Sequence, residues 1–443
     1  MNKLWRNTIA YSLITVLFIA PISAVENFRR VDTDSVPSNI LDGGWLEECD
    51  GVKILHISGT NYEMGYQHGY FLREEIQENI RGFLGLYEQH DVPFSFVIDM
   101  WSIQQHYLPE EYKQEIQGMA DGADLSYDEI ALHNTWVGAF NYVYLCWGAA
   151  LWGDATANGK LLHMRGVDGG NSIMDELTGT YVYENQAIMI RKPDQAYASI
   201  APIFAGDIVS IGGFNNQSVG VSELSIITDN DTTFHGINAG YRMRMVLDYA
   251  TDGYEAVDIM NSNRTCHWNF IVSDGSSPMG FAIEQSANLA NAYTCFDPVE
   301  STEPFWAIKD VVRRGNCYIS PTMADMERDV YDPSGIRGLI RFFFFNDPTF
   351  GTWAQYKAIS DEIENHYGTL TTESALTLLR EVYSGKTGFL SWFLSTGDDT
   401  ARQWVGCPTT GEFAICFAQN GMQAYQNEVH TFNFYELLEA EPP

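Results

Sequence analysis

The sequence has few positive charges. Its 443 residues include 25 lysines and arginines against 58 aspartates and glutamates, which gives a formal net charge of −33 at pH 7. Nucleic acids and anionic membrane surfaces attract basic proteins, so neither is expected as a partner. The charge favours a neutral or cationic ligand and does not indicate a fold.

Several motifs with well-defined chemistry are also missing. The sequence has no Cys-x-x-Cys pair and no His-Glu-x-x-His motif, so no metal site is predicted, and it has no glycine-rich phosphate loop. It also shows no internal repeat or low-complexity segment. We therefore expect chemistry that comes from individual side chains, without a cofactor.

Only the N-terminus carries a long apolar run. Lys3 and Arg6 precede "IAYSLITVLFIA", and the run ends in small residues at Ala24. This order is typical of a secretory signal peptide over residues 1–24, and the run is short for a membrane span. We expect a secreted protein with no stable membrane insertion after signal removal. The sequence leaves the oligomeric state open.

Seven cysteines are an odd number for an exported chain. Six could pair in disulfides, in a pattern that the sequence does not determine, and one would remain free. Cys146, which lies in "YLCWGAALWG", is our candidate for the free thiol. The alternative is a buried cysteine that packs as a small apolar residue.

The segment before Cys146 is mostly helical in its periodicity. Two capping-box spacings, in which a Ser or Thr precedes a Glu by three residues, mark helix starts at Thr60 and Ser126. A further helix is predicted over 97–119.

The chain after Cys146 changes character. Short apolar segments alternate with Gly, Asn and Asp turns, which is typical of strands. Helices are predicted over 241–261 and 371–383, and the last strand is predicted over 430–437. Runs of strands with separate helices indicate an α+β layered fold with mostly antiparallel sheet.

Cys146 is a candidate nucleophile. A thiol attacks as the thiolate and needs a base or a positive partner, because its free pKa is about 8.5. The few histidines lie in unrelated contexts, and the neighbourhood lacks the Cys-Gly-Ser-Cys-Trp pattern of papain-like proteases. If the bond before Cys146 were cut, the new α-amino group, with a pKa of about 7.7–8.0, could act as the base. Arg165 and Asp168, near the end of a predicted strand, could then hold the amine and polarise the substrate.

Several segments together resemble one known family. "CWGAALWGDATANGKLLHMRGVD" is similar to the nucleophile region of the isopenicillin-N acyltransferase-like (acyl-CoA:6-aminopenicillanic acid acyltransferase-like) autoproteolytic cysteine Ntn hydrolases. "GTNYEMGYQHGYFLREEI" resembles the opening segment of that family. Later segments resemble it in the same order: "GGFNNQSVGVSE", "WNFIVSDGSSPMGFAIEQS" and "IRGLIRFFF". The resemblance covers residues 53 to about 345.

The resemblance implies a fold and a division of the chain. The fold is a four-layer αββα sandwich of Ntn-hydrolase type with a helical N-terminal region. Self-cleavage between Leu145 and Cys146 would separate a helical pro-segment or small subunit, 25–145, from the αββα domain, 146–443. The signal peptide, 1–24, precedes both.

The resemblance also assigns roles near the cysteine. Cys146 matches the nucleophile, Asp168 the carboxylate that orients its amine, and Arg165 the arginine beside it. The implied reaction is hydrolysis or acyl transfer at a linear amide or related acyl bond, through a cysteinyl acyl-enzyme. The implied partner is a small-molecule acyl-amide substrate.

Three more residues match the family at a greater distance from the cysteine. Asn215 and Asn269 match asparagines placed to bind an oxyanion or the amine. Arg341 matches a later arginine and is assigned to substrate binding.

The chain also departs from the family pattern. Gly166 stands where the family has asparagine, Gly169 stands where it has an aromatic residue, and Leu145 stands where relatives often have glycine. These changes predict a reshaped substrate pocket. Two alternatives stay open: a phospholipase B-like acyl-ester hydrolase, and a non-catalytic secreted binding protein on the same fold.

Overall fold

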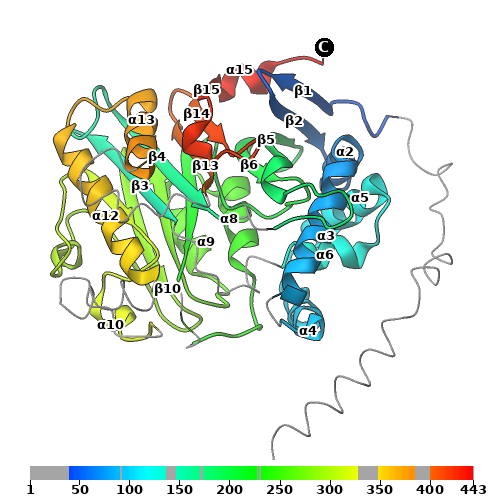
Figure 1. The fold of residues 1–443 in the computed structure, drawn as a ribbon, viewed down its shortest axis with the longest axis horizontal. Helices are drawn as coiled ribbons and strands as arrows, with labels where there is room; N and C mark the ends of the chain where they lie inside the picture. Colours follow the sequence, from blue (N-terminus) through cyan, green and yellow to red (C-terminus); the bar gives the residue numbers. More distant parts are fainter. Residues whose placement is uncertain are drawn as a thin grey trace, which may run out of the picture. The chain divides into compact units, whose positions relative to one another are not determined.

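Two β-sheets organise the chain (Figure 1). The computed structural model describes residues 39–89, 92–135, 146–169, 173–226, 228, 231–327, 348–384 and 400–442. The larger sheet has nine strands in the order β1-β2-β5-β6-β7-β8-β9-β10-β11, and the smaller has six in the order β12-β3-β4-β13-β14-β15. Among these described strands β2 and β5 pair in parallel, and the other neighbours pair antiparallel, as the sequence predicts.

The elements have the following bounds. The larger sheet consists of β1 (Trp45–Cys49), β2 (Val52–Gly59), β5 (Gln186–Pro193), β6 (Ser199–Phe204), β7 (Gly212–Asn215), β8 (Val219–Ser225), β9 (Trp268–Asp274), β10 (Met279–Gln285) and β11 (Ala290–Tyr293). The smaller sheet consists of β12 (Val311–Arg314), β3 (Trp147–Gly153), β4 (Gly159–Asp168), β13 (Thr400–Cys407), β14 (Glu412–Phe417) and β15 (His430–Asn433). The described α-helices are α2 (Asn61–Phe71), α3 (Arg73–Gln89), α4 (Phe94–Gln104), α5 (Glu110–Ala123), α6 (Tyr127–His133), α8 (Ala239–Tyr249), α9 (Gly253–Asn261), α10 (Pro321–Ala324), α12 (Pro348–Asn365), α13 (Thr372–Tyr383) and α15 (Phe434–Glu439).

The two sheets face each other, and helices cover their outer sides. His163 on β4 joins the sheets, because its two ring nitrogens lie 2.8 Å from the hydroxyls of Ser222 on β8 and Ser273 on β9. Helices α8 and α9 pack on the larger sheet, and α13 packs on the smaller one beside α12 (Figure 1). This order of layers is αββα, and it confirms the predicted fold class.

Burial keeps His163 neutral. The ring is fully buried and stacks on Trp404, with centroids 5.1 Å apart. Burial, helped by the charge of Arg165, lowers the pKa of His163 to about 3. This histidine therefore acts as a neutral hydrogen-bonded link between the sheets, which agrees with a structural rather than a catalytic role.

Glycines allow α2 and α5 to approach each other closely. A Cβ added to Gly65 would lie 2.1 Å from the carbonyl oxygen of Glu115, and one added to Gly118 would lie 2.0 Å from that of Tyr62. Any side chain at these positions would force the helices apart. The glycine spacing in "YEMGYQHGY" thus has a packing cause. The predicted capping boxes at Thr60 and Ser126 are confirmed at the starts of α2 and α6.

The residues before Cys146 take part in the larger sheet. β1 and β2 lie at its edge, and β2 pairs with β5 from Ile54 opposite Ile188 to Gly59 opposite Pro193. Leu41–Pro443 accordingly forms one compact unit. The two parts of the chain on either side of Cys146 therefore share a sheet.

Three predicted elements are wrong in extent. The single helix over 97–119 is two helices, α4 and α5, because Pro109 precedes the second and cannot continue the first. The helix over 241–261 is divided into α8 and α9, since the Asp252 side chain caps the start of α9. The strand over 430–437 ends at Asn433, whose side chain caps α15. The helix predicted over 371–383 is confirmed as α13.

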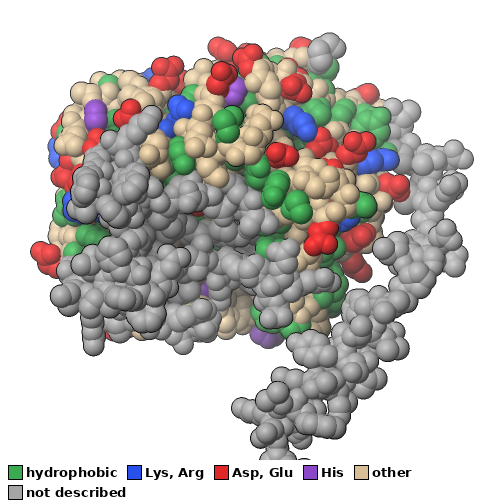
Figure 2. Space-filling view, in the orientation of Figure 1, with side chains coloured by type: hydrophobic (Ala, Val, Ile, Leu, Met, Phe, Trp, Pro, Cys, Tyr) green, Lys and Arg blue, Asp and Glu red, His purple; other side chains and the backbone are tan. Residues whose placement is uncertain are grey.

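The surface agrees with the acidic composition, whereas the cysteines do not form the disulfides that their number allowed. Acidic side chains outnumber basic ones on the face shown in Figure 2. All seven cysteines lie in the described residues, and no two of them form a disulfide in this structure. No helix in the described part of the chain has the length and apolarity that crossing a membrane requires.

Candidate active site

Cys146 lies directly before β3, the strand next to the edge of the smaller sheet. β3 begins at Trp147, between β12 and β4. The side chain is buried in an apolar cluster that includes Leu224 and Ile271 of the opposite sheet. The thiol therefore points into the space between the two sheets, where only a few polar groups can reach it.

A tight turn brings Arg165 back to Cys146. Gly159 has a φ of +75°, which glycine adopts without strain, and β4 then runs antiparallel to β3 with Arg165 opposite Gly148. Arg165 Nη2 lies 3.2 Å from Cys146 Sγ. The predicted juxtaposition of these two residues by the "ANGK" turn is observed.

Asp168, at the end of β4, also lies near the thiol. Its carbonyl oxygen is 4.0 Å from Cys146 Sγ, and its side chain is almost fully buried. The next residue, Gly169, has a φ of +117°, a value that an aromatic side chain would strain. The glycine that departs from the family pattern is thus required by the backbone where the chain leaves Asp168.

Glu223 on β8 completes an ion pair that the sequence did not reveal. Its Oε1 accepts a hydrogen bond from Arg165 Nη2 at 2.8 Å, across the space between the sheets. Burial opposes the charge of Arg165, but Cys146 and Glu223 together raise the pKa of the guanidinium. Arg165 therefore stays cationic beside the thiol. The only sequence signal for Glu223 is a carboxylate within an otherwise buried strand.

The thiol is protonated in the uncut chain near neutral pH. Burial raises the pKa of Cys146 to about 11; Glu223 and Asp168 act in the same direction, while Arg165 acts against them. The described contacts of Cys146 include no histidine. The described groups around Cys146 thus include a positive partner for a thiolate, Arg165, and no base that could form the thiolate.

Asn316 contacts the backbone nitrogen of Cys146. Its Oδ1 accepts the hydrogen bond from that amide, and its Nδ2 donates to Ser225 at the carbonyl oxygen, 2.7 Å away, and at the hydroxyl, 2.9 Å away. Asn316 is separated from Cys146 by 170 positions, so no local pattern indicates the contact. It was missed at the sequence level.

Asn269 lies one step further from the thiol than predicted. Its Nδ2 donates to the carbonyl oxygens of Gly315, at 3.0 Å, and Cys317, at 2.8 Å. These residues flank Asn316. The structure therefore connects Asn269 to the site through Asn316 and shows no described contact between Asn269 and the thiol.

Asn215 is not brought to the site. At the end of β7, its Nδ2 donates to the carbonyl oxygens of Leu247, at 3.1 Å, and Ala250, at 2.9 Å, near the C-terminus of α8. Its Oδ1 accepts from the backbone nitrogens of Gln217 and Val219, each at 3.0 Å. The carboxamide is occupied by these backbone bonds, so its observed role is to hold a turn and a helix end. Leu145 and Arg341 fall outside the described residues.

Tyr383 fills the space left by Gly166. A Cβ at Gly166 would lie 2.5 Å from Tyr383 Oη and 3.1 Å from Cζ. The hydroxyl, which α13 positions, also interacts with the Asp168 side chain. Burial and the charges of Asp168 and Cys146 raise the pKa of Tyr383 well above its ordinary value, so it stays a neutral donor. The departure from the family's asparagine therefore has a structural counterpart on α13.

We expect Gly166→Ala to lower the free energy of unfolding by about 1–3 kcal/mol, because the new methyl group overlaps a buried hydroxyl. Combining it with Tyr383→Phe removes the closest atom and should restore much of the loss. Urea unfolding of the single and double variants measures this coupling. Gly85→Ala on α3 is the control, since nothing lies within 4 Å of its Cβ position. Equal effects of the two alanine substitutions would contradict the overlap.

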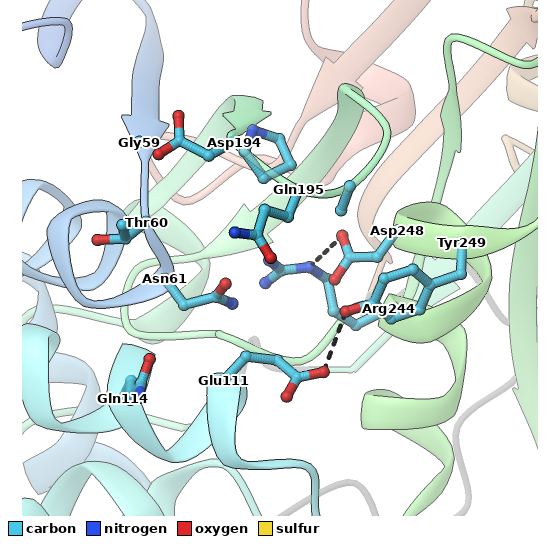
Figure 3. A pocket seen from close by; sticks show the side chains of 12 residues that line it. Gly59, Thr60, Asn61, Glu111, Gln114, Asp194, Gln195, Arg244, Asp248 and Tyr249 are labelled. Atoms are coloured by element: carbon cyan, nitrogen blue, oxygen red, sulfur yellow. Dashed lines mark hydrogen bonds and ion pairs between the residues drawn. The ribbon is translucent and has the colours of Figure 1, made fainter.

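A polar pocket lies away from the cysteine. It has a volume of about 350 Å³ and is lined by the start of α2, by α5, by the turn between β5 and β6, and by the end of α8 (Figure 3). Its buried arginine, Arg244, already pairs with Asp248, at 2.9 Å, and Glu115, at 3.0 Å. The charge is compensated within the protein, so this pocket is not assigned to the chemistry of Cys146.

Comparison with known proteins gives distant matches. No family model matches the chain. An uncharacterised protein of Archaeoglobus fulgidus is 24% identical over 316 residues, which are 63% of this chain and 50% of that protein. Protein dcd1B of Dictyostelium discoideum is 26% identical over 285 residues, which are 58% of this chain and 55% of that protein. The chain thus spans about half the length of these curated relatives.

Three solved structures align with about two thirds of this chain. A variant of the conjugated bile acid hydrolase from Clostridium perfringens matches 67% of this chain and 95% of its own, with 14% identity and a TM-score of 0.41. An N-acylethanolamine-hydrolyzing acid amidase ortholog from Caenorhabditis elegans matches 65% and 100%, with 13% identity and a TM-score of 0.40. Penicillin V acylase from Agrobacterium tumefaciens matches 66% and 87%, with 12% identity and a TM-score of 0.40. By name these three proteins are a hydrolase, an amidase and an acylase. Because these scores are below 0.5, the αββα class rests on the layers described above.

Proposed function

We propose that this chain is an exported cysteine hydrolase or acyltransferase that acts on a linear amide or related acyl bond after cleavage between Leu145 and Cys146. The observation that carries the proposal is the set of contacts at Cys146. Its thiol lies 3.2 Å from a buried, cationic Arg165, and its backbone nitrogen is held by Asn316 at the start of β3. The family whose segments this chain resembles, the isopenicillin-N acyltransferase-like cysteine Ntn hydrolases, is the one we propose for it.

Cleavage would supply the base that the uncut site lacks. In the intact chain the nitrogen of Cys146 belongs to a peptide bond and cannot accept a proton. After cleavage it becomes an α-amine with a pKa of about 7.7–8.0, which lies near the working pH. Asp168, beside the thiol, would orient this amine. Arg165 would stabilise the thiolate, which burial otherwise disfavours.

The reaction then proceeds in two stages. The amine takes the thiol proton, and the thiolate attacks the acyl carbon to form a tetrahedral intermediate. The C–N bond breaks, the leaving amine takes the proton, and the acyl group stays on Cys146 as a thioester. Water or a second amine attacks this thioester, gives up a proton to the α-amine, and releases the acid or the new amide. The thiol is regenerated.

The two pieces should stay together after cleavage. β2 belongs to the N-terminal piece and pairs in parallel with β5 of the C-terminal piece. Leu55 and Ile57 of β2 are buried in the same core cluster as α8 residues such as Met243 and Val246. Separation would expose this apolar surface to water, so we expect a tight complex of the pieces.

Intact-mass analysis of the mature protein tests the proposal. We expect two species, 25–145 and 146–443, that co-elute in native size exclusion and separate under denaturing conditions. A panel of acyl-amides, thioesters and phospholipids then identifies the bond that is broken. A single uncut chain with no turnover of any panel member would overturn the proposal, and phospholipid turnover alone would redirect it to ester hydrolysis.

A further inference from the structure

The loop that carries Asn316 is held from the opposite sheet. The loop follows β12, the edge strand of the smaller sheet, and Asn316 is its second residue. Asn269 on β9 and Glu284 on β10 belong to the larger sheet and are directly paired in the β9–β10 register. Both side chains are fully buried. Paired residues of adjacent strands share a face of the sheet, so the two side chains act on the loop together.

The two residues hold different parts of the loop. Asn269 donates to the carbonyl oxygens of Gly315 and Cys317, on either side of Asn316. Glu284 Oε1 accepts from Arg314 Nε and from the backbone nitrogen of Ile319, each at 2.9 Å. Its Oε2 accepts from the backbone nitrogen of Ser320 at 3.1 Å. The loop is therefore bound before, around and after Asn316.

The buried amide of Asn269 is not fully satisfied. Its Nδ2 bonds two carbonyls, whereas its Oδ1 has no hydrogen-bond partner among the described residues. A buried acceptor without a partner is costly, so an apolar residue would serve better if packing were the only demand. The structure therefore uses Asn269 as a hydrogen-bond donor to the loop.

We infer that Asn269 and Glu284 are positioning residues that act through Asn316. Ser225 fixes the Nδ2 of Asn316, and Asn269 and Glu284 fix the loop backbone, so that Asn316 Oδ1 is held where it accepts from the nitrogen of Cys146. The inference rests on the proposed function and extends it, because Asn269 and Glu284 would set the position of the Cys146 nitrogen, which becomes the base after cleavage. A displacement of about 1 Å at such an atom can cost about 10²-fold in rate.

Hydrogen exchange tests the positioning without requiring activity. In the Cys146→Ala background the chain stays uncut, and the amide at position 146 remains a reporter. We expect Asn269→Ala to speed exchange at this amide at least tenfold, as Asn316→Ala does by removing the acceptor itself. Asn215→Ala is the matched control, because it removes a fully buried carboxamide from β7 of the same sheet without touching the loop. Unchanged exchange in Asn269→Ala, or an equal rise in Asn215→Ala, would overturn the inference.

Kinetics in the Cys146 protein give the second readout. Asn269→Ala should slow self-cleavage and lower kcat by about 10–100-fold while KM changes less than threefold, because its carboxamide nitrogen is bonded to the loop carbonyls of Gly315 and Cys317. Asn269→Ser keeps one hydrogen-bond donor and should recover part of the rate. If the alanine variant folds poorly, the serine variant replaces it in the comparison with the parent protein. A loss of kcat that is no larger than the fraction of unfolded protein would contradict the inference. If the parent protein neither cuts itself nor turns over substrate, the proposed function fails, while the exchange experiment still decides the positioning.

Discussion

Cys146→Ala is expected to abolish both self-cleavage and acyl-group turnover, with turnover falling by at least about 10⁴-fold. The substitution removes the atom that would attack the acyl carbon, and no other described residue can replace it, because Arg165 and Asn316 offer no nucleophile. The fold should survive. The side chain lies in an apolar cluster, and Arg165 keeps its ion pair with Glu223, so the free energy of unfolding should change by only about 1 kcal/mol.

Cys416→Ala is the control for this substitution. Cys416 is a fully buried free thiol on β14 of the same sheet, and burial raises its pKa to about 12. Its polar contacts are with Gln403, far along the chain from the β3–β4 turn. We expect a similar stability change and unchanged turnover. Intact mass, substrate turnover and urea unfolding of both variants test whether Cys146 is the nucleophile. Residual turnover in Cys146→Ala would assign the chemistry to another group.

Local signals predicted the parts of the site that are close in sequence. The capping boxes, the β3–β4 turn and the strand that ends at Asp168 depend on residues within a few positions of each other, and each is observed. The approach of Arg165 to Cys146 follows from that turn alone. The α+β layered class followed from the order of elements, because strands with separate helices have few stable layered arrangements. The αββα arrangement was implied by the family resemblance.

The missed residues all come from the opposite sheet, an edge loop or a covering helix. Glu223 meets Arg165 across the sheets, Asn316 reaches Cys146 from beyond β12, and Tyr383 arrives on α13. Nothing in their own neighbourhoods marks them, since their partners are chosen by tertiary packing. For Asn215 the sequence suggested a site residue that the structure places elsewhere. Its motif predicted a role in the chemistry, but its side chain satisfies the backbone at the end of α8.

The departures from the family pattern were informative once the structure was available. Gly166 predicted a reshaped pocket, and the structure shows which group occupies the space, the Tyr383 hydroxyl beside Asp168. A missing side chain was therefore compensated by one from a distant helix. The sequence locates the change but does not indicate its partner, because Tyr383 lies 217 positions after Gly166 and no pattern connects the two.

Arg165→Gln is expected to lower turnover by about 10²–10³-fold and the free energy of unfolding by about 3–5 kcal/mol. The two effects have separate causes. Turnover falls because the thiolate loses its cationic partner at 3.2 Å, and the charge of Arg165 no longer opposes the rise in the thiol pKa that burial causes. Stability falls because Glu223 is left as a buried charge without its counter-ion. Arg165→Lys should recover part of both, since lysine keeps the charge but cannot reach the thiol and the carboxylate with a planar fork.

The double variant Arg165→Gln/Glu223→Gln separates these causes. It removes both charges, so most of the lost stability should return, as is common when a buried ion pair is replaced rather than broken. Turnover should stay low, because the thiolate still lacks its partner. Urea unfolding and turnover measured on the parent, the two single variants and the double variant form a complete cycle. If turnover returned together with stability, Arg165 would be a structural residue, and the protonated α-amine would have to stabilise the thiolate alone, because Asp168 raises the pKa of the thiol.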